Sequence, residues 1–225
     1  MATDSDLASR AATAFHVAVF CKAPISGRVK SRLIPTLGAA QATAVYHQLV
    51  QRTLDTIQST RQKFQASASL WVADDLEHPD IRAWASGFDL PLYLQCGDDL
   101  GARMLHCMLS LHRHHQKVLL IGTDCPILQP GDLHSAAAAL GADQPWVFTP
   151  AEDGGYVLAG SCAPAATAFT GIAWSTDAVM TQTRSALAAA GLRWGEMPTL
   201  WDVDQPADVD RAAALDLLRC RAPGH

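Results

Sequence analysis

Short apolar runs alternate along the chain with longer segments in which apolar side chains recur every three to four residues. The apolar runs predict strands at residues 15–21, 69–73, 90–95, 117–122, 146–149 and 156–159, and a last strand near residues 196–203. The amphipathic segments predict helices at residues 39–59, 79–86, 130–140, 176–190 and 207–218. Another helix begins after Asp98 or Asp99, either of which suits an N-cap, and continues through Leu111.

Strands that alternate with helices in this way predict βαβ units and a mostly parallel sheet. We therefore expect a single α/β domain over residues 15–218, with flexible ends at residues 1–14 and 219–225. In such sheets ligands bind at the carboxyl ends of the strands. The chemically informative side chains follow predicted strands, which places them at that edge.

Composition narrows the partners and the compartment. The net charge of −5 argues against nucleic acid as the main partner, because binding to a phosphate backbone needs a basic domain. None of the six cysteines forms a C-x-x-C pair, so we expect a reducing compartment, the cytoplasm. No apolar run approaches the ~18 residues that a membrane-spanning helix needs, and the first fourteen residues lack the apolar core of a signal peptide.

Residues 22–32, directly after the first predicted strand, contain four cations and no acid. Such a loop in an acidic protein predicts binding of a small, specific anion, because Lys and Arg donate to phosphate oxygens and glycine lets the backbone approach a ligand. The loop is not a P-loop, which would require a further glycine near Pro24. The alternative is a solvated basic turn. The candidate phosphate-binding residues are Lys22, Gly27, Arg28, Lys30 and Arg32.

Acidic residues follow two other predicted strands. Asp124 comes directly after the apolar run 118–122, where a carboxylate can hold Mg²⁺ or Mn²⁺. Asp202 and Asp204 are spaced i, i+2, so on an extended segment they point to opposite faces unless a bend brings both to one ion. The alternatives are a turn at Asp124 and a helix-entry turn at residues 202–206. An aspartyl-phosphatase nucleophile is disfavoured, because its D-x-D pair follows the first strand.

A turn at residues 152–156 joins acids to paired glycines. Gly154 and Gly155 permit close backbone approach to a sugar or base, and Tyr156 follows them. Asp153 is the candidate catalytic base or hydroxyl ligand. The alternative is an ordinary turn, because Asp-Gly is a strong turn signal.

The link between the third strand and its helix supplies two further candidates. Arg103 is a candidate for facing the phosphates, and Asp98 for contacting substrate or capping the helix. The histidines further along this helix are interpreted as a solvated helix end, and they are His106, His112, His114 and His115.

Six segments taken together resemble a known family, the bacterial glycosyltransferase-A-like transferases of the radical-SAM-associated and arsenosugar-pathway type. The segments occur in the order expected for that family and extend over roughly residues 15–212. Ser31 and Gln205 stand where Thr is usual, and Val157 replaces a second aromatic residue. The segments are Phe20-x-Lys-x-Pro-x-x-Gly-x-x-Lys-x-Arg-Leu33, Gly97-x-Asp-Leu-Gly-x-Arg-Met104, Ile121-Gly-x-Asp-x-Pro126, Pro150-x-x-Asp-Gly-Gly-Tyr156, Trp174-Ser175 and Asp202-Val-Asp-x-Pro206.

The resemblance implies the nucleotide-diphospho-sugar transferase superfamily and a three-layer Rossmann-like GT-A fold with a mixed, mostly parallel central sheet. It also implies that Asp124, Asp202 and Asp204 hold Mg²⁺ or Mn²⁺, and that the loop from Lys22 to Arg32 holds the phosphates. The reaction stays open, because this fold hosts several chemistries.

Three functions remain open at this point. The first is glycosyl transfer from a nucleotide-sugar to a small-molecule acceptor. The second is nucleotidyl transfer from a nucleoside triphosphate to a phosphorylated small molecule, with release of pyrophosphate. The third is a non-catalytic nucleotide-binding partner of a redox or radical enzyme, which the full set of acids argues against.

Overall fold

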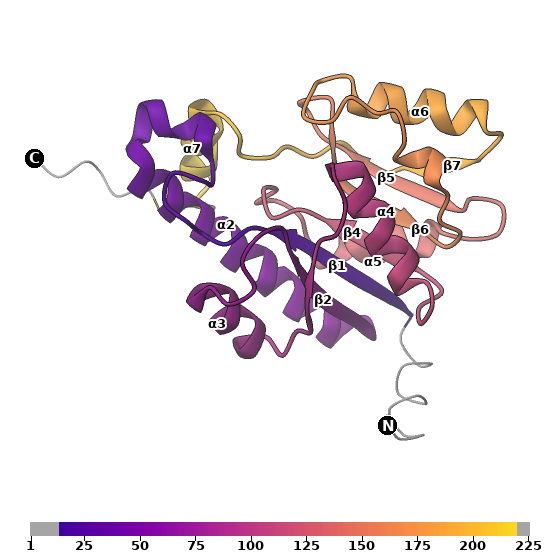
Figure 1. The fold of residues 1–225 in the computed structure, drawn as a ribbon, viewed down its shortest axis with the longest axis horizontal. Coiled ribbons are helices and arrows are strands. Elements are labelled where there is room, and N and C mark those ends of the chain that lie inside the picture. Colours follow the sequence, from indigo (N-terminus) through magenta and orange to yellow (C-terminus); the bar gives the residue numbers. More distant parts are fainter. Residues whose placement is uncertain (1–13, 220–225) are drawn as a thin grey trace, which may run out of the picture.

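A seven-stranded sheet runs through the centre of the computed structural model, which describes residues 14–219 (Figure 1). The strand order is β3-β2-β1-β4-β6-β5-β7. Neighbouring strands are parallel except at β6, which is antiparallel to both β4 and β5. The strands are β1 Phe15–Cys21, β2 Ala66–Val72, β3 Leu92–Leu94, β4 Val118–Ile121, β5 Trp146–Pro150, β6 Tyr156–Ser161 and β7 Trp194–Glu196.

Helices cover both faces of this sheet. Buried side chains of α2, α3 and α5 pack on one face, and those of α4 and α6 pack on the other. The α-helices are α2 Ile34–Lys63, α3 Pro79–Gly87, α4 Leu100–Leu111, α5 Pro130–Ala139, α6 Val179–Ala189 and α7 Pro206–Ala214, and the 3-10 turns are η1 Ser31–Leu33 and η2 Ala166–Ala168. The expected three-layer α/β fold with a mixed, mostly parallel sheet is confirmed.

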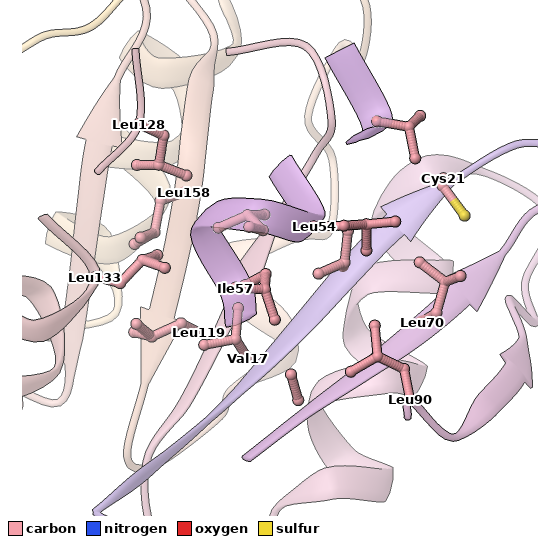
Figure 2. Close-up of a cluster of buried hydrophobic side chains, with 14 of the residues drawn as sticks. Val17, Cys21, Leu54, Ile57, Leu70, Leu90, Leu119, Leu128, Leu133 and Leu158 are labelled. Atoms are coloured by element: carbon pink, nitrogen blue, oxygen red, sulfur yellow. The ribbon is translucent and has the colours of Figure 1, made fainter. Parts of the chain in front are cut away.

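The first core layer explains why the apolar runs become strands. Val17 on β1 and Leu119 on β4 meet Leu54 and Ile57 on α2, and each of the four side chains is at most 1% exposed (Figure 2). Burying an aliphatic side chain of this size stabilises a fold by about 1.5–3 kcal/mol. All four residues of β4 are buried because both faces of the sheet are covered, which is why this strand is a continuous apolar run.

A third cluster of buried apolar side chains packs the last helix of the described chain, α7, against α2. Val209 and Ala212 of α7 pack with Val45 and Leu49 near the start of α2. Figure 1 shows α7 (yellow) beside α2 (violet), although the two are far apart in sequence. This contact brings the segment before α7 to the loop before α2.

Several element boundaries differ from those expected, among them the start of β2 at Ala66 instead of residue 69, the start of α6 at Val179 instead of residue 176 and the end of α7 at Ala214 instead of residue 218. Helix α2 spans Ile34–Lys63 but has a kink at Gly38, whose φ 77° and ψ 159° are not helical, so the part after the kink begins at residue 39 as expected and extends beyond residue 59. The strand expected near residues 196–203 was wrong beyond Glu196. Pro198 has no backbone N–H for a ladder. Beyond β7 the pairing is reduced to the bond from the Met197 N–H to β5 and an isolated bridge between Leu200 and Ala151.

Within residues 14–219 no helix has both the length and the apolar character needed to cross a membrane. The expected flexible ends, residues 1–14 and 219–225, lie outside the described residues apart from Ala14 and Arg219. The single domain expected over residues 15–218 stays a prediction.

Candidate active site

The cationic loop follows the carboxyl end of β1, as expected. Hydrogen bonds to two side chains hold the start of its backbone in place. The Lys22 N–H donates to the Tyr46 hydroxyl at 2.8 Å, and that hydroxyl lies 3.1 Å from the Lys22 carbonyl, to which it donates. The N–H of Ala23 donates to Asp74 Oδ1 at 2.8 Å. Burial raises the pKa of Tyr46 far above its ordinary value, so the hydroxyl stays protonated and keeps both contacts.

Sequence reasoning missed Tyr46. Its position on the buried face of α2 marks it as a core residue, and Val45 and Leu49 on that face gave the same apolar signal. A tyrosine hydroxyl needs a polar partner when it is buried, and this was the one available hint.

The loop's cations divide into exposed and buried groups. Lys22, Arg28 and Arg32 are exposed, whereas the side chain of Lys30 is only 4% exposed. Gly27 at φ 83° turns the loop, and a Cβ there would meet no atom within 4 Å, so space lies open above its backbone. The loop therefore offers three cations to solvent and turns one inward.

The inward cation joins three distant segments. Lys30 Nζ lies 2.6 Å from Asp124 Oδ1 and donates to the Val203 carbonyl at 2.6 Å. The Val203 N–H in turn donates to the Asp124 carbonyl at 2.9 Å. The phosphate loop, the end of β4 and the segment before α7 thus meet at one edge of the sheet.

The acids on the last segment are held in two ways. The Arg32 guanidinium forms an ion pair with Asp204, whose N–H donates to Asp208 Oδ2 at 3.0 Å. The second carboxylate of the segment, Asp202, is half-buried. Asp208 also caps α7 by accepting from Gln205, so the helix start fixes the acidic segment.

Asp202 is placed among like charges. Burial raises its pKa to about 7, and the nearby negative charges of Asp153, Asp124 and Asp204 add to the rise, while Lys30 opposes it. Three carboxylates that sequence analysis selected, Asp124, Asp153 and Asp204, are therefore close enough to Asp202 to disfavour its charged form.

The carboxylate oxygens of these acids are the type of ligand that binds a divalent cation. Carboxylate oxygens are the ligands that Mg²⁺ and Mn²⁺ prefer, and crowded carboxylates are relieved by a cation. Asp124 Oδ1 is buried and accepts no directed hydrogen bond within the described residues, although the Lys30 ammonium stands beside it. In residues 14–219 no three His, Cys, Asp or Glu side chains converge closely enough to share one ion. The assignment of Asp124, Asp202 and Asp204 as ligands stays a prediction.

The turn that carries Asp153 connects β5 to β6 at the same edge. Asp153 Oδ1 accepts from the Gly155 N–H at 2.8 Å, which leaves its other oxygen available. Gly154, at φ 89°, packs so closely that a Cβ would lie 2.1 Å from the Asp177 carbonyl oxygen. The Tyr156 hydroxyl instead lies 3.9 Å from Met104 Sδ within the second apolar cluster. Gly154 therefore makes a close packing contact, the Tyr156 hydroxyl lies in the core, and the roles of this turn toward substrate stay predictions.

A clamp that sequence analysis missed ties this turn to α7. Arg211 forms a two-bond ion pair with Glu152, at 2.7 and 3.2 Å, and its guanidinium lies 4.3 Å from the centre of the Trp201 ring. The pair lowers the pKa of Glu152 and raises that of Arg211. No local pattern marks two residues 59 apart in sequence, so this contact was visible only in the fold.

The two candidates at the start of α4, Asp98 just before it and Arg103 in its first turns, form no hydrogen bond or ion pair with these acids in the described part of the chain. Asp99, not Asp98, caps α4, because its Oδ1 accepts from the Ala102 N–H at 2.7 Å. Asp98 is exposed, and Arg103 Nε donates to the Gly97 carbonyl at 3.0 Å. Their roles with substrate and phosphate remain predictions.

Solved structures with a similar fold include transferases of two reaction types. A protein from Desulfovibrio desulfuricans G20, provisionally named a nucleotide-diphospho-sugar transferase, superposes with a TM-score of 0.76 at 27% identity, over 86% of this chain and 83% of that chain. The 4-diphosphocytidyl-2C-methyl-D-erythritol synthase of Anaerococcus prevotii DSM 20548 has a TM-score of 0.60 at 13% identity, over 92% and 98% of the two chains.

A third similar structure holds a metal and a nucleotide. Glucosyl-3-phosphoglycerate synthase of Mycobacterium tuberculosis, solved with Mn²⁺, UDP and glucosyl-3-phosphoglycerate, has a TM-score of 0.52 at 11% identity, over 96% of this chain and 81% of that chain. These likenesses confirm the nucleotide-diphospho-sugar transferase fold that the resemblance predicted. The narrower radical-SAM-associated and arsenosugar type stays a prediction.

Sequence comparison gives the family itself. No curated protein matches the chain. A family model matches residues 56–176, which is more than half of the 225 residues. The chain therefore belongs to the bacterial family described as "Uncharacterized protein conserved in bacteria (DUF2064)".

Proposed function

We propose that the chain is a metal-dependent transferase with a nucleotide-activated donor, and that it moves a sugar from a nucleotide-sugar to a small acceptor. The observation that carries the proposal is the contact of the cationic loop, through Lys30, with both Asp124 and the segment 202–204. Cations for phosphate oxygens and carboxylates for a hard metal ion are thereby gathered at the edge where open α/β sheets bind ligands.

The loop's cations would hold the donor's diphosphate. Lys22 and Arg28 are exposed and free to turn toward it, Arg32 is exposed beside its ion pair with Asp204, and the open space at Gly27 lets the backbone approach. Asp124, Asp202 and Asp204 would hold Mg²⁺ or Mn²⁺, which neutralises the charge of a departing diphosphate when bound.

The reaction is a substitution at the anomeric carbon. The acceptor's hydroxyl oxygen forms a bond to that carbon while the bond from the carbon to the diphosphate oxygen breaks, and the nucleoside diphosphate leaves. Asp153 would accept the hydroxyl proton, because it lies near the metal carboxylates on a turn open to solvent. Gly154, Gly155, Tyr156 and Asp98 would shape the substrate side, and Arg103 would face the phosphates.

Nucleotidyl transfer is the second candidate, and the number of loop cations favours it. Four cations suit a triphosphate, whose α-phosphorus an acceptor phosphate would attack with loss of pyrophosphate. The cytidylyltransferases among the similar structures share the fold with this chain.

A thermal-shift panel of nucleoside triphosphates and nucleotide-sugars, each with and without Mn²⁺, tests the proposal. A ligand at ~100 times its dissociation constant stabilises by about 2.7 kcal/mol, or several degrees for a chain of this size. Asp124→Asn should lose the metal-dependent part of the shift. Asp89→Asn, at a carboxylate that is 99% exposed, is the matched control and should keep it.

The product then separates the candidates. Release of nucleoside diphosphate supports glycosyl transfer, and release of pyrophosphate supports nucleotidyl transfer. A metal-dependent shift without turnover on any acceptor supports the non-catalytic binding partner. An unchanged shift in Asp124→Asn would refute the metal assignment.

A further inference from the structure

Lys30 is the one cation of residues 22–32 that is turned inward, and its surroundings are unusual for a phosphate ligand. Its side chain is 4% exposed, whereas that of Asp124 is 46% exposed. A buried ammonium requires compensating partners, and Lys30 has two, Asp124 Oδ1 and the Val203 carbonyl oxygen, each at 2.6 Å. The Lys30 ammonium therefore balances the negative charge of Asp124, as a bound metal cation would.

The backbone supports this placement. Lys30 has φ 48° and ψ 45°, a left-handed conformation that residues with a side chain rarely adopt unless the surrounding structure holds them there. The residue stands immediately before η1, whose buried Leu33 joins the core layer between α2 and α7. The packed turn that follows thus holds Lys30 in this conformation and directs its ammonium to Asp124.

An ammonium and a divalent ion at the same carboxylate repel each other. Mg²⁺ binds oxygen at about 2.0–2.1 Å, and a lysine ammonium already 2.6 Å from the same atom would repel it strongly in a partly buried setting. Metal binding at Asp124 is therefore weaker while Lys30 stays in place and stronger once Lys30 has moved away. A phosphate group on the loop gives the displaced ammonium a new partner.

We propose that Lys30 is an internal counter-ion that competes with the divalent cation for Asp124, so that metal and nucleotide phosphate bind this edge interdependently. This inference rests on the proposed function and deepens it. Without nucleotide the ammonium holds Asp124 and metal binds weakly. With nucleotide the ammonium moves to phosphate, and the carboxylate is released to the metal. By linkage, each ligand strengthens the other's binding by the same factor.

Binding of Mn²⁺ alone, followed by electron paramagnetic resonance of the free ion, tests the inference without any catalytic readout. Lys30→Gln should lower the dissociation constant for Mn²⁺ at least tenfold relative to the unaltered chain. Lys22→Gln removes the same charge from an exposed position of the same loop, so solvent screening should keep its effect below about threefold. Asp124→Asn added to Lys30→Gln should remove the gain.

Lys30→Asn provides a second variant, because asparagine tolerates the left-handed backbone. A dissociation constant that fails to fall in either folded variant, or that falls equally in Lys22→Gln, would overturn the counter-ion role. A different measurement, nucleotide binding by Asp124→Asn, tests the proposed function itself. If Asp124→Asn binds nucleotide with Mn²⁺ as well as the unaltered chain, the metal assignment itself is wrong. If only the Lys30 variants fail to respond, the proposed function stands and the counter-ion role does not.

Discussion

Replacing Gly154 by alanine tests whether close packing positions the turn that carries Asp153. A Cβ at Gly154 would lie 2.1 Å from the carbonyl oxygen of Asp177, so the backbone must shift by more than about 1 Å to restore contact distance. The Met180 N–H donates to the Gly154 carbonyl at 2.9 Å, which ties the same turn to the start of α6 and opposes that shift.

The expected loss combines two effects. Overpacking costs about 1–3 kcal/mol, and φ 89° adds about 1 kcal/mol for a residue with a side chain. A total near 3 kcal/mol should lower the melting temperature by about 6–12 °C at this chain length. Transfer activity should fall further than stability alone explains, because Asp153 moves with the turn.

Gly171→Ala is the matched control. Gly171 also has a positive φ, 75°, but a Cβ there would meet no atom within 4 Å. Thermal or urea unfolding of both variants separates the backbone effect, present in each, from the clash, present only at Gly154. Equal stability of the two variants would refute the packing argument, and full activity of Gly154→Ala would refute the positioning of Asp153.

Three further predictions concern residues that the fold brings into contact. Tyr46→Phe leaves the Lys22 N–H without its partner and should cost about 1–3 kcal/mol in urea unfolding, with weaker nucleotide binding; an unchanged stability would contradict the anchoring role. Arg211→Met should lower kcat more than it raises KM, because it frees the Asp153 turn from α7, whereas Arg211→Lys should recover part of the loss; equal activity of the two variants would count against the clamp. Burial lowers the pKa of His112 below 6.5, so the stability that its neutral form supports is present above pH 6.5 and is lost as the pH falls through the folded-state pKa. His112→Gln should therefore narrow the difference between urea midpoints at pH 7.5 and pH 5.5, and an unchanged difference would exclude this histidine as a source of acid sensitivity.

Local patterns in the sequence were sufficient to predict most of the helices and strands. The run Val118–Ile121 is apolar because both faces of the sheet are covered, and this continuous burial is what a sequence records most directly. Local chemistry also limited the cap of α4 to Asp98 or Asp99, of which Asp99 is the one, and placed the start of the last helix within one residue of Pro206. Local chemistry did not mark the boundary of β7, because it depends on which β5 carbonyls the irregular segment after Glu196 can reach.

The sequence by itself also determined the edge of the sheet at which the site residues lie. The cationic loop, Asp124 and the segment 202–204 each follow a predicted strand, which placed them at the carboxyl ends of the strands. The structure brings these three segments together. Three of the residues selected as candidates, Asp124, Asp153 and Asp204, lie close enough to a fourth, Asp202, to raise its pKa.

Only the tertiary structure decided the partners within that edge. The contact of Lys30 with Asp124, the support of Lys22 by Tyr46 and the pairing of Arg211 with Glu152 each join segments that the chain separates by 24 to 94 residues. Such pairs leave no periodic or local signature. They depend on crossover connections and helix packing, which set distances between side chains, whereas sequence patterns set only which face each side chain occupies.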